Sequence, residues 1–207
     1  MRRRAFLLGA AALPLGACAG GTSVWAPDDA LARARFPNPG PTSLALITVR
    51  NERNKSGEHT ALFIAASERA MFDPFGGWTD PFVPERDDVL FGLSDEALGR
   101  YLDYQAGGGF FYVRQEKGVP PEVAEVALGR AKAHGPVGAA QCARAVGTVL
   151  ADLPGFEGLG RPWLPDTMAR RFARLPGVVT TERHGPGFGP EDAPEDAPGK
   201  ASRPVPA

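Results

Sequence analysis

Residue types that hold metals or exchange electrons are scarce in this chain. Only two cysteines and three histidines occur among 207 residues. The sequence has no CxxC pair and no two histidines at metal-ligand spacing, which argues against a redox or metal protein. Beyond residue 17 it also lacks a basic tract that could bind nucleic acid. We therefore expect no cofactor, no metal and no nucleic-acid partner.

Long hydrophobic runs are also missing. Thirteen mostly apolar residues follow Arg2–Arg4, from Ala5 to Ala17, whereas a bilayer-spanning helix needs about 20 residues. The run has the form of an export signal. Its end, LGAC, resembles the lipobox of bacterial lipoproteins, which implies cleavage before Cys18 and a lipid on that thiol. A cytosolic protein with an apolar N-terminus is the alternative.

The route and destination of export follow from the same segment. RRAFLL resembles a twin-arginine signal without the usual polar residue before the pair, so both the general and the twin-arginine routes stay open. Cleavage after residue 17 leaves 20 basic and 24 acidic residues, a net charge of −4. We expect a protein held by its lipid on the periplasmic side of the cell envelope, at the outer membrane.

Composition divides the chain into four segments. After the signal peptide (1–17), residues 18–40 contain GGTS and PNPGP and suggest a tether, with Trp25 able to pack back onto the domain. Residues 41–182 are long enough for one domain with a sizeable core. Residues 183–207 repeat EDAP and are rich in proline, glycine and charge, which is typical of a disordered tail.

Periodicity within the domain predicts an α+β fold, with a small antiparallel sheet packed against helices. The first three β-rich runs are separated by short polar segments, so we expect three adjacent antiparallel strands. A serine N-cap, an N-terminal proline and Gly-Pro stops mark helix ends. The expected strands are 43–51, 59–66, 69–75, 109–117 and 177–182, and the expected helices are 94–106, 120–136, 139–153 and 165–175.

Cys142 is the only cysteine left after residue 18, and it lies in the first turn of the helix expected at 139–153. The helix has apolar residues at offsets of 0, 4, 7, 8 and 11 from Cys142, which form one stripe facing the core. In the first turn, free backbone N–H groups and the helix dipole favour a thiolate. The alternative is a buried cysteine that acts only as a small hydrophobic residue.

His59 is the histidine best placed to serve such a thiol as a base, because it begins an apolar strand. His134 ends a helix and His184 borders the tail, so both suit structural roles. If an odd number of residues turns the chain after 59–66, Asp73 faces the same side as His59 and could orient its ring. With an even turn it faces away. His59 as a surface residue and Asp73 as a turn-former are the alternatives.

These motifs carry a family resemblance over about residues 43–155. SGEHTALFI resembles the GHT strand, and QCARAVGTVLADLPGF the Asn-Cys helix, of circularly permuted papain-like hydrolases and acyltransferases, which are related to NlpC-type peptidases and lecithin retinol acyltransferase. Periplasmic lipoproteins and the periplasmic domain of Lnb-like membrane proteins are similar. The resemblance implies a permuted papain-like fold.

By the same resemblance, Cys142 is the nucleophile, His59 the base and Asp73 the orienting group. Gln141 stands where the family has asparagine, and its amide or the Cys142 N–H would serve an oxyanion hole. Glu58 stands where the family has glycine before the histidine.

Together these features predict an envelope lipoprotein that acts as a thiol hydrolase or acyltransferase on an amide or ester of cell-envelope peptide or lipid. Its expected partners are the membrane, through Cys18, and an envelope substrate or protein. The alternative is an inactive binding or scaffold lipoprotein of the same fold, in which Cys142 is merely packed.

Overall fold

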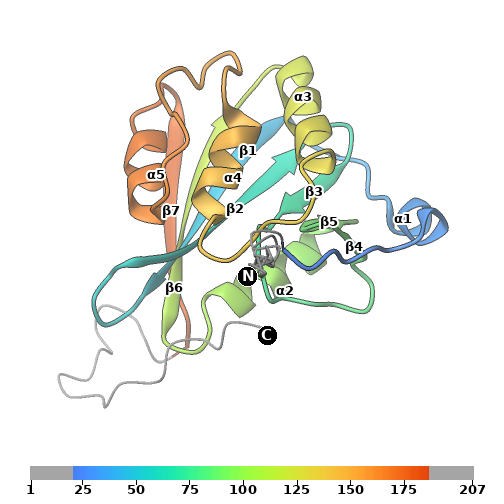
Figure 1. Ribbon diagram of the computed structural model, residues 1–207, viewed down its shortest axis with the longest axis horizontal. Coiled ribbons are helices and arrows are strands. Elements are labelled where there is room, and N and C mark those ends of the chain that lie inside the picture. The colour runs from blue at the N-terminus through green and yellow to red at the C-terminus, as the bar shows by residue number, and fades with distance from the viewer. Residues whose placement is uncertain (1–20, 187–207) are drawn as a thin grey trace, which may run out of the picture.

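A seven-stranded antiparallel sheet forms the centre of the computed structural model, which describes residues 21–186 (Figure 1). The strand order is β4-β5-β3-β2-β1-β6-β7. The α+β prediction is confirmed, as is the adjacency of the first three strands. The predicted signal peptide, Cys18 and residues 187–207 of the predicted tail lie outside the described residues. The elements are α1 (Asp28–Ala34), β1 (Ser43–Asn51), β2 (Gly57–Ala65), β3 (Arg69–Phe72), β4 (Glu85–Arg86), β5 (Val89–Phe91), α2 (Asp95–Gln105), β6 (Phe110–Gly118), α3 (Pro121–Lys132), α4 (Cys142–Leu150), α5 (Pro165–Phe172) and β7 (Val178–His184).

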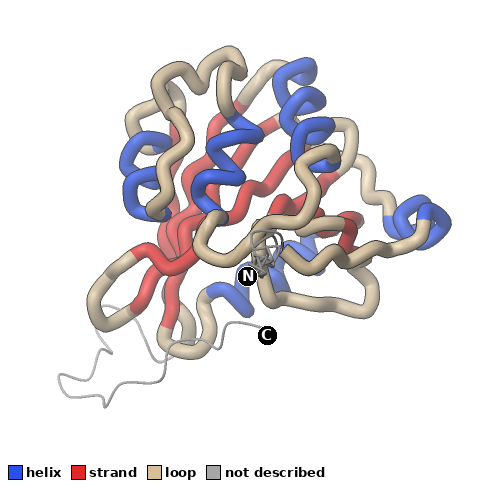
Figure 2. Tube along the Cα trace, viewed as in Figure 1, coloured by secondary structure: helices blue, strands red, loops and turns tan. Residues whose placement is uncertain are grey.

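Helices cover both faces of the sheet centre. Helices α3, α4 and α5 lie side by side on one face and α2 lies on the other (Figures 1 and 2). Because side chains alternate along a strand, Leu44 and Leu46 of β1 pack with the three-helix face, while Ala45 and Ile47 pack with α2. This double covering explains why β1 is a continuous apolar run instead of an alternating one.

Helix α4 packs tightly between the sheet and the loop that follows it. Its apolar stripe is buried as predicted, from Cys142 to Leu150. A Cβ added to Gly147 would lie 2.7 Å from the Gly160 carbonyl oxygen and 2.9 Å from the Arg161 Cα. Glycine at this position therefore allows the 156–164 loop to close over the helix.

The expected tether is not free over residues 21–40, because this segment docks along the domain. It contains α1, and it forms bridges between Trp25 and Arg86 and between Pro37 and Glu68. The Arg86 guanidinium stacks 4.1 Å from the Trp25 ring centre. Trp25 does pack back, as expected, but the folded domain begins well before residue 41.

The predicted boundary at the tail also shifts. Strand β7 pairs with β6 along its length and ends at His184, two residues inside the segment predicted as tail. The two short strands β4 and β5 were not expected, because two and three residues are too few for a periodic signal. No helix within residues 21–186 is long and apolar enough to cross a membrane.

Candidate active site

The site lies where the edge of β2 is left open. Strand β2 has nine residues and β3 only four, and their last pair is Leu62 with Phe72. Among the described residues, Gly57–Ala61 therefore have β1 on one side and no strand on the other. Asp73 and the first turn of α4 meet β2 at this open edge.

His59 and Asp73 form a short hydrogen bond here. The turn from β2 to β3 has three residues, because Ala65 pairs with Arg69. This odd number puts Asp73 on the face of His59, as the first of the two turn alternatives requires. His59 Nε2 lies 2.6 Å from Asp73 Oδ1. Asp73 is 3% exposed, so the pair is shielded from water.

Asp73 also forms the turn that follows β3. Its carbonyl accepts the Gly76 N–H at 2.8 Å, and a Cβ at Gly76 would collide with the Asp73 carboxylate. Its backbone therefore makes the turn while its side chain holds His59, so the turn-forming role and the orienting position coexist in one residue.

Cys142 lies at the start of α4 with its sulfur against His59. The His59 ring and the backbone N–H groups of Thr60 and Ala143 lie beside this sulfur and act on its pKa as hydrogen-bond donors. Because Nε2 is bonded to Asp73, Nδ1 is the ring nitrogen that remains for Cys142. Cys142 is 7% exposed, so its sulfur is buried beside the His59 ring.

The electrostatics of this arrangement favour an ion pair. Burial raises the pKa of the Cys142 thiol, but the hydrogen bond and charge of His59 and the two backbone N–H groups lower it further than burial raises it. Burial lowers the pKa of His59, yet the charge and hydrogen bond of Asp73, with those of Cys142, raise it to about 10. A thiolate beside an imidazolium is the form that reacts with electrophiles.

Two further residues hold Asp73 in place, one at its carboxylate and one at its backbone. The Tyr101 hydroxyl, on α2, donates to Asp73 Oδ1 at 3.0 Å. The Asp73 N–H donates to the Asp88 carbonyl at 2.8 Å, and the Asp88 carboxylate accepts the N–H of Val137 at 2.7 Å and of Phe75 at 3.2 Å. Asp88 thus ties the end of β3 to the loop that leads into α4.

Neither Tyr101 nor Asp88 was expected from the sequence. Tyr101 lies on the buried stripe of a predicted helix, and a buried tyrosine hydroxyl needs a partner, which was the only available signal. Asp88 has a φ of 65°, and nothing in the local sequence specifies that its carboxylate reaches a segment 49 residues away.

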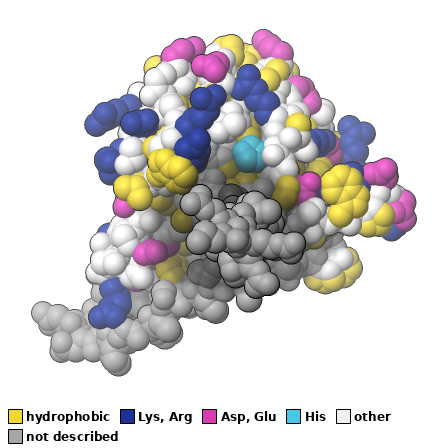
Figure 3. All heavy atoms as spheres, in the orientation of Figure 1, with side chains coloured by type: hydrophobic (Ala, Val, Ile, Leu, Met, Phe, Trp, Pro, Cys, Tyr) yellow, Lys and Arg dark blue, Asp and Glu magenta, His cyan; other side chains and the backbone are white. Residues whose placement is uncertain are grey.

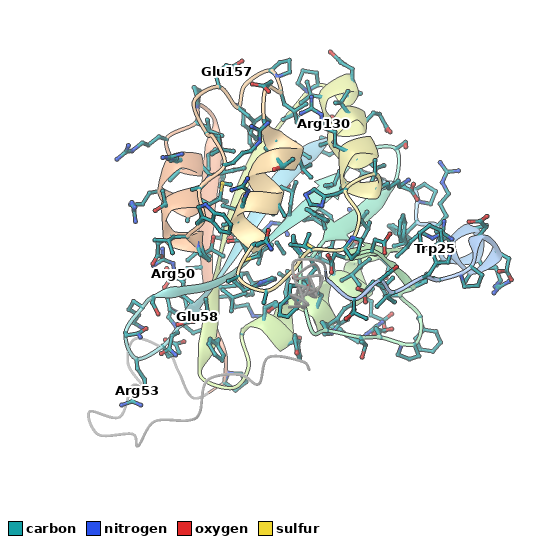
Figure 4. The ribbon with its side chains drawn as sticks, in the orientation of Figure 1. Trp25, Arg50, Arg53, Glu58, Arg130 and Glu157 are labelled. Carbon is teal, nitrogen blue, oxygen red and sulfur yellow. The ribbon has the colours of Figure 1, made fainter. Side chains whose placement is uncertain are left out.

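Gln141 and Glu58, the two residues that differ from the motifs this sequence resembles, both lie near the site. Gln141 is the N-cap residue of α4, and its side chain makes no cap hydrogen bond. Glu58 is exposed, and its carboxylate accepts the Ser56 hydroxyl at 2.6 Å in the β1–β2 hairpin (Figure 4).

The other two histidines have partners elsewhere. His134 follows α3 and packs against Phe72, with ring centres 5.2 Å apart. His184 lies between Glu52, 2.6 Å from Nδ1, and Glu182, 2.8 Å from Nε2. Over residues 21–186, no group of three or more His, Cys, Asp or Glu side chains could hold a metal ion.

Comparisons of the chain with protein-family models, with curated proteins and with solved structures found no match.

Proposed function

We propose that this protein is a thiol hydrolase or acyltransferase that cleaves an amide or ester through a covalent thioester on Cys142. One observation carries the proposal: a cysteine at a helix start lies beside a histidine whose Nε2 is hydrogen-bonded to a buried carboxylate. Nucleophile, base and orienting group in this order form a general arrangement for acyl transfer. The resemblance to permuted papain-like enzymes points to the same chemistry.

In the first step, the Cys142 thiolate attacks the acyl carbon, a C–S bond forms and the carbonyl electrons move to oxygen. The tetrahedral adduct then collapses, and the protonated His59 gives its proton to the leaving amine or alcohol as the C–N or C–O bond breaks. A water, or an amine or alcohol acceptor, then attacks the thioester carbon while His59 takes its proton, and the second tetrahedral adduct collapses as the C–S bond breaks and the Cys142 thiolate leaves. Water makes the protein a hydrolase, and a second acceptor makes it an acyltransferase.

The negative charge on the acyl oxygen needs donors near the sulfur. The first N–H groups of a helix have no intrahelical acceptor, and Cys142 is the first residue of α4. Its own N–H and the side-chain amide of Gln141 are the donors that we assign to this role. Gln141 is free to turn toward a substrate, because its side chain does not cap the helix.

The substrate class follows from the proposed location. A lipid on Cys18 would hold the protein in the cell envelope, on the periplasmic side of the outer membrane, where amides and esters of envelope peptides and lipids are available. The envelope membrane and such a substrate are the partners that we propose.

The reactivity of Cys142 tests the proposal directly. We would use the chain from residue 18 with Cys18→Ser, which keeps every described residue and has Cys142 as its only thiol. Iodoacetamide should modify Cys142 well below about pH 8, because the ordinary cysteine pKa is about 8.5. Mass spectrometry measures the extent, with Cys142→Ser as the blank. Resistance to alkylation until denaturation would contradict the proposal and favour an inactive scaffold.

A further inference from the structure

The first described residues dock beside the candidate site. A Cβ added to Gly21 would collide with the Val137 carbonyl, so the chain at Gly21 lies against the loop that leads into α4. The next residues continue this contact: the Ser23 hydroxyl donates to Asp87 at 2.6 Å, and the Asp87 N–H donates to the Val24 carbonyl at 2.9 Å. Val137 is five residues before Cys142 and is bonded to Asp88.

This docking sets a short distance to the proposed lipid anchor. Cys18 is three residues before Gly21, and an extended chain spans at most about 3.6 Å per residue. A lipid on Cys18 would therefore leave the chain no more than about 11 Å from Gly21. The domain would be held against the membrane on its Cys142 side, and not at a distance by a long tether.

An exposed apolar pair lies on the same side of the domain. Trp163 is 54% exposed and Leu164 is 65% exposed, and both precede α5. The Arg144 guanidinium lies 4.7 Å from the Trp163 ring centre, and Arg144 is two residues after Cys142 on α4. Large apolar side chains exposed next to a candidate site are typical of an interaction surface.

Positive charge surrounds this pair. Five exposed arginines belong to α4, to α5 and to the loops beside it, and none of them is in an ion pair with a carboxylate within residues 21–186. The acid at the start of α5, Asp166, is paired with Arg50 at 2.8 Å. Figure 3 shows Lys and Arg side chains gathered beside hydrophobic ones over the α4–α5 side of this face. We name these arginines, together with Trp163 and Leu164, the α4–α5 surface. The arginines are Arg144, Arg161, Arg170, Arg171 and Arg174.

We propose that the α4–α5 surface docks on an anionic phospholipid bilayer. Exposed tryptophan and leucine beside unpaired arginines suit the boundary between headgroups and acyl chains. This docking goes beyond the proposed acyl-transfer chemistry and does not depend on it. The orientation of the domain on the membrane rests on the docking and also on the proposed lipid anchor at Cys18. Together they bring the start of α4 to the membrane, so the substrate of Cys142 is a lipid or a lipid-linked molecule of that membrane.

Vesicle binding without the anchor tests the surface. The chain from residue 18 with Cys18→Ser keeps all the contacts described above, and it is sedimented with vesicles of phosphatidylcholine, alone or mixed with phosphatidylglycerol. We expect binding to the mixed vesicles that weakens with salt, and at least about tenfold weaker binding to phosphatidylcholine alone. Trp163→Ser with Leu164→Ser, and separately Arg170→Glu with Arg174→Glu, should each weaken binding to mixed vesicles by about tenfold or more.

The matched control is Phe82→Ser. Phe82 is 78% exposed and its loop packs near α2, on the other face of the sheet. This variant should bind mixed vesicles like the parent chain. Three results would overturn the proposal: no binding of the parent chain to vesicles, surface variants that bind like the parent, or an equal loss of binding in Phe82→Ser. The first result would leave an acidic protein as the partner of the α4–α5 surface.

Iodoacetamide modification of Cys142 in the same variants separates the two proposals. Vesicle binding with an inert thiol would refute the acyl-transfer chemistry and keep the docking surface. A reactive thiol without vesicle binding would refute the docking surface and keep the acyl-transfer chemistry.

Discussion

His59 and His184 are both hydrogen-bonded to carboxylates, yet only one of them belongs to a candidate site. His59 is bonded to one buried carboxylate and faces a thiol. His184 is bonded to two glutamates and stacks on Phe111, with ring centres 4.6 Å apart. Burial lowers the pKa of His184, but Glu52 and then Glu182 raise it on balance. A raised histidine pKa is therefore no mark of catalysis here, and the nucleophile at the helix start makes the difference.

Replacing His59 and, separately, His184 with alanine should give the largest contrast, which is in the reactivity of Cys142. His59→Ala should lower the alkylation rate of Cys142 at about pH 6.5 by tenfold or more, because the thiolate loses its cationic partner. His184→Ala should change the rate by less than about twofold, since its partners are Glu52 and Glu182. The pH profile of iodoacetamide modification measures both. Equal effects of the two variants would remove the distinction.

The carboxylate partners should differ in what they contribute to stability. Asp73→Asn should cost about 2 kcal/mol in the free energy of unfolding, because a buried charged hydrogen bond to His59 is lost. Glu182→Gln should cost less than about 0.5 kcal/mol, since the Glu182 side chain is 51% exposed and its pairing with His184 is screened by solvent. Urea unfolding at neutral pH measures both, with circular dichroism to check the fold. A larger loss for Glu182→Gln would reverse the comparison.

The Asp73 contribution should also depend on pH. The pKa of His59 rises from 6.5 to about 10 in the folded chain, so the stability from protonated His59 is complete below about pH 6.5 and is lost as the pH rises through about 10. The difference in unfolding free energy between the native chain and Asp73→Asn should shrink over this range. Urea unfolding at several pH values measures it. A difference that stays constant over this range would mean that His59 is neutral in the folded chain.

Among the changes within the site, the smallest effect should come from the tyrosine that supports Asp73. Tyr101→Phe keeps the ring that packs edge-on against Trp78 and removes the hydroxyl that donates to Asp73 Oδ1. We expect a loss of about 1 kcal/mol, typical of one hydrogen bond, and a small rise in the pH of half-maximal alkylation. Thermal unfolding together with the alkylation profile checks this. An unchanged profile would assign Tyr101 a purely structural role.

Local patterns account for most of the elements and for part of the site. Strand β1 has the bounds predicted for it, 43–51. The serine N-cap predicted for the 94–106 helix is confirmed, because the Ser94 hydroxyl accepts the Ala97 N–H. The tether was misassigned because GGTS and PNPGP have the composition of a linker, whereas the docking of residues 21–40 depends on Arg86, Glu68 and Val137, which are far along the chain.

The sequence by itself determined the longer helices and strands of the domain, because strand alternation and helix periodicity depend on neighbours a few residues apart. It also placed Cys142 in the first turn of a helix with its side chain on the buried stripe, but it left the parity of the β2–β3 turn open. Only the tertiary structure decided that His59, Asp73 and Cys142 meet. Strand β3 ends after four residues and leaves the edge of β2 open to α4. Asp88 connects the end of β3 to the loop before α4. These segments are far apart in the sequence, so no local pattern could have predicted the contact.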